Sequence, residues 1–201
     1  VPIISEPGKL PTEFKQVADP EIHLEDQNDE FANYFKGVEV PKVLITTSEN
    51  ARNKTWKLAL ELGSCIPNSF VLKRKRLGVK QIIKQAKARN FTSVMVINDD
   101  KGTPNGMLIS HLPEGPTALF RLSNPVLRCE FNKRYKIKAK GRGEAYQQPS
   151  NHRPELIIKR FGTRLGHRVS KLFSSLYPHD PQFSGRQVAT FYNQRDFIFF
   201  R

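Results

Sequence analysis

Apolar residues recur along this chain with two different periods, and these periods predict where strands and helices lie. Short, continuous apolar runs rich in β-branched residues indicate strands that are covered on both faces. Apolar residues spaced three and four positions apart indicate helices with one buried face. From residue 41 onward the predicted order is β-α-β-α-β-β-β, then a linker, then β-α-β-β.

The first set of elements, at 41–123, predicts a mixed α/β sheet with helices packed against it. The helix at 79–89 is amphipathic, with Ile82 and Ala86 on its apolar face and several lysines opposite. Gly63 and Pro67 end the helix before it. The predicted strands are 42–47, 69–72, 94–97, 107–109 and 118–122, and the predicted helices are 52–63 and 79–89.

The second set, at 154–201, resembles the start of the first. Phe70 lies 27 positions after Val43, and Phe183 lies 27 positions after Leu156, in both cases across a helix and a proline. A duplicated strand–helix–strand unit would produce this spacing, so two similar α/β halves are the predicted architecture. We expect the protein to continue beyond Arg201, which would leave the second half incomplete here. The predicted elements are a strand at 156–158, a helix at 163–177 and a hairpin of strands 188–192 and 197–200.

Two segments lack these periods. Residues 1–40 are acidic and interrupted by four prolines, which predicts an extended N-terminal segment. Residues 124–153 are basic and rich in Gly, Gln and Asn near their end, which predicts a flexible linker. The six basic residues in its central run, with no acid between them, are Lys133, Arg134, Lys136, Lys138, Lys140 and Arg142.

Three aromatic residues, Phe31, Tyr34 and Phe35, interrupt the acidic segment. They predict one amphipathic turn, which docks either on a partner protein or on the folded body. A solvated leader is the alternative. We therefore treat these three residues as candidate partner-binding residues.

The net charge points to a polyanionic ligand. The 201 residues include 33 Lys and Arg and 19 Asp and Glu, for a net charge of +14. Residues 1–40 hold nine acids and three bases, a net charge of −6, so the remaining 30 bases and 10 acids give +20. Nucleic acid is the commonest partner of such a body. The alternative is a basic protein that is kept soluble by its charge.

Several clusters of Lys and Arg are candidate RNA-binding sites. Cations that neutralise phosphates release counterions, so the affinity should fall as salt rises. For each cluster taken singly, a solvated surface is the alternative. Phe191, Tyr192 and the last phenylalanines could stack on bases, but their alternation favours the core. Besides the linker residues, the candidates are Lys73, Arg74, Lys75, Arg76, Lys80, Lys84, Lys87, Arg164, Arg168, Lys171 and Arg186.

Motifs of other functional classes are scarce. No apolar run reaches the roughly 18 residues that a membrane span needs, and the first residues lack the order of a secretory signal. Cys65 and Cys129 cannot form a disulfide framework, which favours a reducing intracellular compartment. No phosphate-binding loop or histidine metal motif is present. Asp99 and Asp100 are explained by turn chemistry, and the glycines of 162–166 by helix capping. The sequence therefore predicts no enzyme, cofactor, metal or small-molecule substrate.

Five segments together are similar to the Brix domain family. That resemblance implies two α/β halves like anticodon-binding domains. It also implies a non-catalytic assembly factor in the nucleolus, which binds precursor ribosomal RNA and acts in pre-rRNA processing and 60S subunit biogenesis. Its partners would be other assembly factors and ribosomal proteins of a pre-60S particle. The linker at 125–152 varies in the family, so its role in RNA binding depends on charge alone. The segments that carry the resemblance are 41–48, 96–100, 104–118, 161–168 and 178–201.

Two other functions stay open at this point. The chain could be a protein–protein adaptor within the pre-ribosome, with little direct RNA contact, whose positive charge meets acidic partners. It could also be an RNA-processing enzyme with an unrecognised site, although no base, nucleophile and orienting group can be paired in the sequence.

Overall fold

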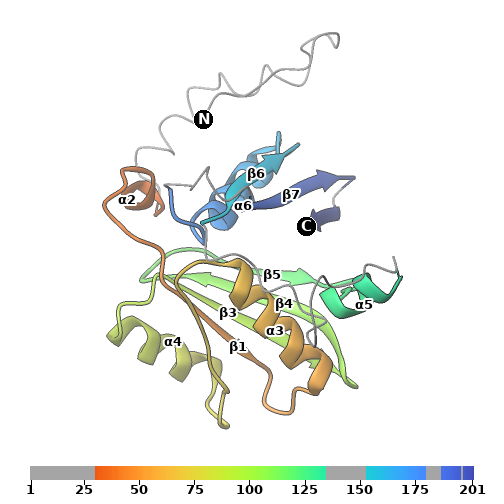
Figure 1. Ribbon diagram of the computed structural model, residues 1–201. Coiled ribbons are helices and arrows are strands. Elements are labelled where there is room, and N and C mark those ends of the chain that lie inside the picture. Colours follow the sequence, from red (N-terminus) through yellow and green to blue (C-terminus); the bar gives the residue numbers. More distant parts are fainter. Residues whose placement is uncertain (1–29, 135–152, 180–186, 196) are drawn as a thin grey trace, which may run out of the picture.

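The computed structural model describes residues 30–134, 153–179, 187–195 and 197–201 and shows an α/β fold built on two sheets (Figure 1). The predicted α/β fold class is confirmed, whereas residues 1–29 of the predicted extended N-terminal segment lie outside the described residues. A five-stranded sheet lies below a smaller three-stranded sheet in this view.

The five-stranded sheet contains every strand predicted between residues 41 and 123, in the order β2-β1-β3-β4-β5. β1 pairs in parallel with β2 and β3, whereas β3, β4 and β5 form an antiparallel meander. β3 and β4 are longer than predicted because their hairpin turns at Lys101 and Gly102, so the predicted turn residues 98–100 are in the strand. The bounds are β1 (Val43–Thr47), α3 (Asn53–Cys65), β2 (Ser69–Val71), α4 (Val79–Ala88), β3 (Ser93–Asp100), β4 (Thr103–His111) and β5 (Thr117–Arg121).

Helices cover both faces of this sheet. Ile45, Met95 and Ile109 point to the face that α3 covers, in one continuous apolar cluster. Leu44 and Val96, one position away in the alternation, point to the other face, where α4 packs with Ile82 and Ala86. This explains why the sequences of β1 and β3 are continuously apolar rather than alternating.

The three-stranded sheet has β6 parallel to β7 and β7 antiparallel to β8. The same order and directions occur in β1, β3 and β4. The repeat is therefore real as a topology, but the 27-residue spacing does not describe it. The strand that pairs with β6 begins at Val188, and Phe183 lies outside the described residues. The bounds are β6 (Glu155–Lys159), α6 (Arg164–Ser174), β7 (Val188–Gln194) and β8 (Phe197–Phe200).

Both sheets contribute to one hydrophobic core, which is centred on α6. The ring centroid of Phe173 in α6 lies 5.1 Å from that of Phe120 in β5 and 4.4 Å from that of Phe191 in β7. Phe191 is buried, as its alternating pattern predicted. In the same hairpin Phe197 and Phe199 are 63% and 47% exposed, because the described residues leave that face of β8 uncovered.

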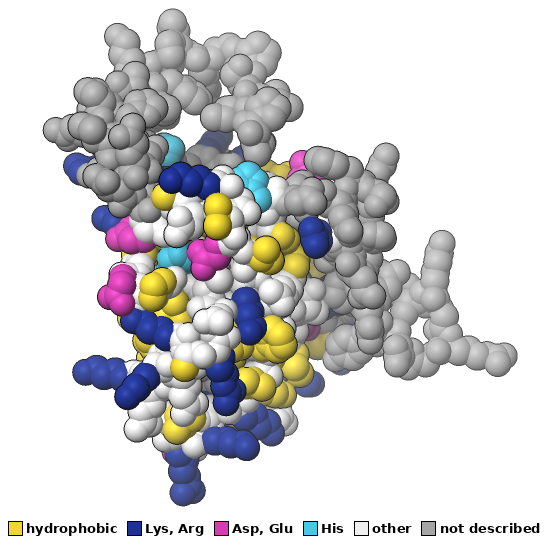
Figure 2. Space-filling model, turned by 90° about the vertical axis from the view of Figure 1, so that its left-hand side faces the viewer, with side chains coloured by type: hydrophobic (Ala, Val, Ile, Leu, Met, Phe, Trp, Pro, Cys, Tyr) yellow, Lys and Arg dark blue, Asp and Glu magenta, His cyan; other side chains and the backbone are white. Residues whose placement is uncertain are grey.

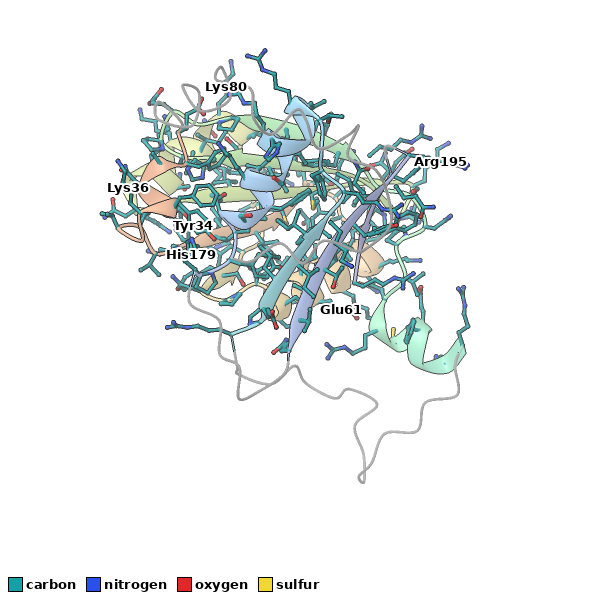
Figure 3. The ribbon with its side chains drawn as sticks, turned by 90° about the horizontal axis from the view of Figure 1, so that it is seen from above. Tyr34, Lys36, Glu61, Lys80, His179 and Arg195 are labelled. Atoms are coloured by element: carbon teal, nitrogen blue, oxygen red, sulfur yellow. The ribbon has the colours of Figure 1, made fainter. Side chains whose placement is uncertain are left out.

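The predicted aromatic turn is the helix α2 (Ala32–Phe35), and it docks on the folded body. Phe31 is fully buried, with its ring centroid 4.6 Å from that of His111. The Tyr34 hydroxyl donates to the carbonyl of Tyr177 at 2.8 Å, and the Tyr34 ring stacks on His179 (Figure 3). Of the candidate partner-binding residues, Phe31 and Tyr34 are thus occupied within the chain. Phe35, 44% exposed, remains accessible.

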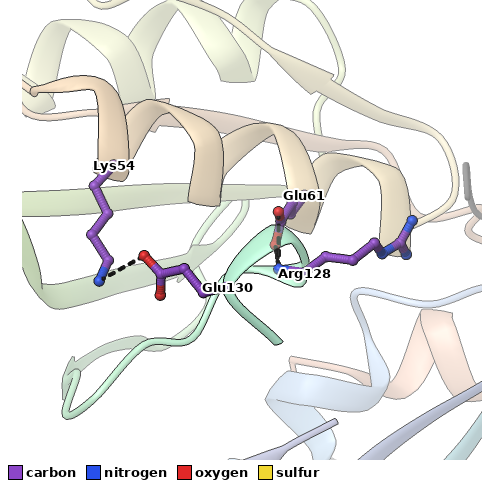
Figure 4. Close-up of polar contacts among 4 residues, drawn as sticks. All are labelled: Lys54, Glu61, Arg128 and Glu130. Atoms are coloured by element: carbon purple, nitrogen blue, oxygen red, sulfur yellow. Dashed lines mark hydrogen bonds and ion pairs between the residues drawn. The ribbon is translucent and has the colours of Figure 1, made fainter. Parts of the chain in front are cut away.

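The prediction of a flexible linker from residue 124 is wrong at its start, where α5 (Arg128–Arg134) packs on α3. The Glu61 carboxylate accepts a hydrogen bond from the Arg128 N–H at 3.0 Å, and Lys54 pairs with Glu130 at 3.3 Å (Figure 4). Leu127 is buried beside them. A carboxylate at a helix N-terminus is favourable, and such a long-range contact is invisible in a pattern dominated by basic residues.

Candidate nucleic-acid interface

The four consecutive basic residues after β2 do not form one patch. Arg74 donates from Nε to the carbonyl of Leu77, so this side chain closes the loop that leads into α4. Lys73 Nζ lies 5.4 Å from the centroid of Trp56, on the α3 side of the sheet. Lys75 and Arg76 are exposed and have positive φ angles of 47° and 62°. Lys73, Lys75 and Arg76 are therefore exposed to a polyanion, whereas Arg74 is engaged within its own loop.

The three lysines of α4 form the clearest basic surface. Lys80, Lys84 and Lys87 are all exposed, on the side of the helix away from the buried Ile82 and Ala86. Figure 2 shows Lys and Arg side chains spread over the lower half of this face of the molecule, where α4 lies. Figure 3 shows Lys80 at the periphery of the fold. The predicted placement of these lysines opposite the apolar face is confirmed, because an amphipathic helix fixes which side chains face solvent, and their role in RNA binding stays a prediction.

Carboxylates neutralise this surface only in part. Lys87 pairs with Glu114 at 3.2 Å, and Arg76 pairs with Glu49 at 3.8 Å, with the Arg76 side chain 91% exposed. Within the described part of the chain, neither Lys80 nor Lys84 has an ion-pair partner. Exposed ion pairs are weak, so phosphates can displace them.

The basic residues of α6 lie elsewhere. α6 packs on the opposite face of the large sheet from α4, so Arg164, Arg168 and Lys171 are separate from the α4 lysines. Arg168 pairs with Glu30 at 3.6 Å, which links it to the end of the acidic segment. The α6 N-terminus is capped by the Thr163 hydroxyl, which accepts from the Gly166 N–H, whereas the predicted capping residues were the glycines of 162–166.

The remaining candidates divide between one helix end and the undescribed residues. Lys133 and Arg134 are exposed in the last turn of α5. Lys136, Lys138, Lys140, Arg142 and Arg186 lie outside the described residues, so their roles stay predictions. The four clusters are therefore not one continuous surface over the residues that the structure describes.

Asp99 has the structural role that turn chemistry predicted. Its carboxylate accepts from the Arg52 N–H at 3.0 Å, from the Gly102 N–H at 2.7 Å and from the Thr55 hydroxyl. It thereby ties the β3–β4 turn to Arg52 and Thr55 at the start of α3. Burial opposes ionisation, but these hydrogen bonds outweigh it and hold the pKa of Asp99 below its ordinary value.

Metal-binding and membrane-spanning features are absent from the described residues. They contain no group of three or more His, Cys, Asp or Glu side chains placed to hold a metal ion. Across the same residues, none of the helices combines the length and the apolar character that crossing a bilayer requires.

Burial raises the pKa of the Cys65 thiol, which disfavours its thiolate form.

Comparison with known proteins identifies the family. The Brix domain model matches residues 48–201. Ribosome production factor 1 of Xenopus laevis is 50% identical over 184 residues, which are 92% of this chain and 50% of that protein. A Brix domain-containing protein of Schizosaccharomyces pombe is 41% identical over 187 residues, covering 91% of this chain and 56% of that protein. The chain thus spans about half the length of the curated relatives it matches.

A solved structure supports the fold independently. The crystal structure of a "probable ribosomal biogenesis protein" from Aeropyrum pernix K1 superposes with a TM-score of 0.54, covering 81% of this chain and 89% of that one at 16% identity. At this identity the likeness shows the fold alone. Since the family model covers most of the chain and matches its folded body, this chain belongs to the Brix domain family.

Proposed function

We propose that this chain is a non-catalytic ribosome assembly factor that binds precursor ribosomal RNA in the biogenesis of the large, 60S subunit. The names of its relatives, Ribosome production factor 1, support a role in making ribosomes. Its working place would be the nucleolus, and its partners would be other assembly factors and ribosomal proteins of a pre-60S particle.

The α4 surface is the observation that carries the RNA-binding part of this proposal. Lys80, Lys84 and Lys87 lie along one exposed side of a single helix. Only Lys87 has an acidic partner within the described residues, and the Glu114 side chain in that pair is 87% exposed. A rigid row of exposed ammonium groups suits a row of phosphates, which it can neutralise without moving any buried group.

A salt titration of RNA binding tests this proposal. We expect replacement of Lys80, Lys84 and Lys87 by Gln to lower the slope of log affinity against log salt by about 2 to 3, since each lost phosphate contact removes about 0.7 to 0.9. The matched control replaces Lys36, Lys57 and Lys159, three exposed lysines on other elements, by Gln. A flat salt dependence for the unmodified chain, or equal losses in both variants, would contradict the proposal.

The protein–protein adaptor is the second candidate, and the Arg168–Glu30 pair at 3.6 Å favours it because there a predicted RNA-binding cation already meets a carboxylate. Cross-linking in native pre-ribosomal particles separates the two. Loss of RNA cross-links with protein partners retained, in the α4 triple variant, supports RNA binding. The reverse result supports the adaptor.

Two further measurements test the remaining parts of the proposal, the non-catalytic role and the nucleolar location. Incubation of the purified protein with precursor RNA and Mg²⁺ should leave the RNA intact, and reproducible cleavage would contradict the non-catalytic role. A fluorescently tagged chain should accumulate in the nucleolus.

A further inference from the structure

The large sheet has one part of a face that no described helix covers. β4 and β5 form it on the side where α4 packs. Strand register places Val96, Leu108 and Leu119 in one row across β3, β4 and β5. Val96 is buried, Leu108 is partly buried and Leu119 is 75% exposed, so cover by α4 decreases across β4 and is lost at β5.

The neighbouring row toward the β3–β4 turn is polar. One row contains Asn98, Gly106 and Arg121, with Asn98 and Arg121 exposed. Because Gly106 has no side chain, the sheet surface is depressed at the middle of that row. The side-chain Nδ2 of Asn98 donates to Asn105 Oδ1 at 2.9 Å, which leaves the side-chain Oδ1 of Asn98 available as an acceptor. The open face thus combines an exposed leucine, an amide and a guanidinium.

The lysines of α4 border this same face. Ile83 of α4 belongs to the cluster that includes Leu108 and Leu112, which places this flank of the helix toward β4. The ion pair of Lys87 confirms this orientation of α4, because its partner Glu114 lies in the connection between β4 and β5. Lys80 and Lys84 follow on the same side of the helix. A row of cations therefore runs beside an open apolar and polar surface.

We propose that a single-stranded segment of RNA lies on this open face of β4 and β5, with its phosphates along the α4 lysines and on Arg121 and its bases over Leu119 and beside Asn98. This inference depends on the proposed function. It adds where the RNA binds and that the RNA is single-stranded, and it adds three residues that the sequence analysis did not identify, Asn98, Leu119 and Arg121. No sequence pattern identified them, because residues 118–120 are all apolar, and only the pairing of β5 with β4 separates the exposed positions Leu119 and Arg121 from their neighbours.

The dimensions and charge of the face favour this ligand. Two neighbouring strands are about 5 Å apart, so the uncovered strip accommodates one nucleotide strand and is too narrow for a duplex. Unpaired bases present flat apolar faces and hydrogen-bonding edges, which Leu119 and Asn98 complement. The cations on the border complement phosphates, and within the described residues no ion pair engages Arg121.

The test compares a surface variant with a matched control on the opposite face of the sheet. Leu119→Ser combined with Arg121→Gln changes the open face. Leu60→Ser combined with Lys57→Gln changes an exposed leucine and an exposed cation of α3. Binding to a 12-nucleotide unpaired RNA and to a 12-base-pair RNA duplex is measured by fluorescence anisotropy with the complete 201-residue chain, and circular dichroism checks that each variant is folded.

We expect the L119S/R121Q variant to bind the unpaired RNA about tenfold more weakly and with a salt slope about 0.7 smaller, as the loss of one phosphate contact and one base contact requires. The L60S/K57Q variant should bind like the unmodified chain. A chain that binds neither RNA overturns the proposed function. Normal binding by L119S/R121Q, with weakened binding by the α4 triple variant, overturns this inference alone.

Two other outcomes also decide against the binding of single-stranded RNA to this face. A preference for the duplex would mean that the lysines follow a double helix and that the open face is not a base platform. Retained RNA affinity, with loss of an acidic protein partner from L119S/R121Q in native particles, would assign the face to protein binding. A folding defect in the double variant is resolved with Arg121→Gln alone, which should still lower the salt slope by about 0.7.

Discussion

The two sheets of this protein share a topology but differ in how they are covered. β1, β3 and β4 have the same order and directions as β6, β7 and β8. In the large sheet, helices pack on both faces of β1 and β3, which are buried over most of their length. In the small sheet, the described residues leave Phe197, Phe199 and Val188 between 44% and 63% exposed.

This difference shows that the repeated topology does not give two independent domains. α6 follows β6 in the chain, yet Leu172 and Phe173 of α6 share a core with Ile45 and Ile97 of the large sheet. The small sheet therefore obtains its buried surface from its neighbour. Since burial of apolar area is the dominant favourable term in folding, we expect the two halves to unfold together.

The largest expected effect comes from Phe173→Ala. Phe173 is 3% exposed and lies between Phe120 of the large sheet and Phe191 of the small one. Removing the ring should lower the free energy of unfolding by about 3 to 5 kcal/mol, the usual result for a buried phenylalanine. Denaturant unfolding measures it, with fluorescence of the single tryptophan, Trp56 in α3, and with far-UV circular dichroism.

The coincidence of the two signals decides whether the halves are coupled. We expect one transition by both probes, shifted equally by Phe173→Ala. A tryptophan transition that stays in place while the circular dichroism transition moves would show that the large sheet folds without α6. The control is Phe197→Ala on the exposed face of β8, which should change stability by less than about 0.5 kcal/mol.

A smaller effect is expected from Tyr34→Phe, which breaks the hydrogen bond from α2 to the body. The change leaves the buried carbonyl of Tyr177 without this donor, at a cost of about 1 to 2 kcal/mol. Burial raises the pKa of Tyr34 to about 12. The unfolded chain ionises near pH 10 and so binds fewer protons than the folded chain between pH 10 and 12. The contribution of Tyr34 to stability is therefore complete below pH 10 and is lost as pH rises through this window.

The measurement is the unfolding free energy of both proteins from pH 8 to pH 12. The unmodified chain should lose stability more steeply above pH 10 than the Tyr34→Phe variant, so that the two curves converge. Parallel curves would mean that Tyr34 is not buried in solution and that α2 does not join the two halves.

Local patterns predicted most of the fold, because each pattern is caused by burial within one element. The apolar run Val43–Thr47 and the amphipathic residues of α4 are examples, and both lie where they were expected. The errors concern contacts between distant residues. α5 depends on Glu61, 67 positions before Arg128, and the burial of Phe31 depends on His111. A periodic pattern within one element carries no information about partners so far away in the sequence.

The candidate site was predicted less completely for the same reason. Charge clustering identified the lysines of α4, since a helix face is a local property. It did not separate Arg74, which bonds its own loop, from the exposed Arg76. It also gave no indication of Arg121, whose proposed role comes from a strand pairing that places it in one row with Asn98. The sequence shows which residues are charged, whereas the fold determines which of them share a surface.

The smallest expected effect, Glu49→Gln, separates stability from binding. Glu49 pairs with Arg76 at 3.8 Å, and the two side chains are 50% and 91% exposed, so its loss should change stability by less than about 0.5 kcal/mol. RNA affinity should instead rise about twofold at low salt, because a carboxylate no longer competes with phosphate for Arg76. The control is Glu155→Gln, an exposed residue of β6 that changes the net charge equally. If both variants gain the same affinity, the effect belongs to the net charge of the molecule. A gain confined to Glu49→Gln would place the RNA beside the loop between β2 and α4, next to the α4 lysines.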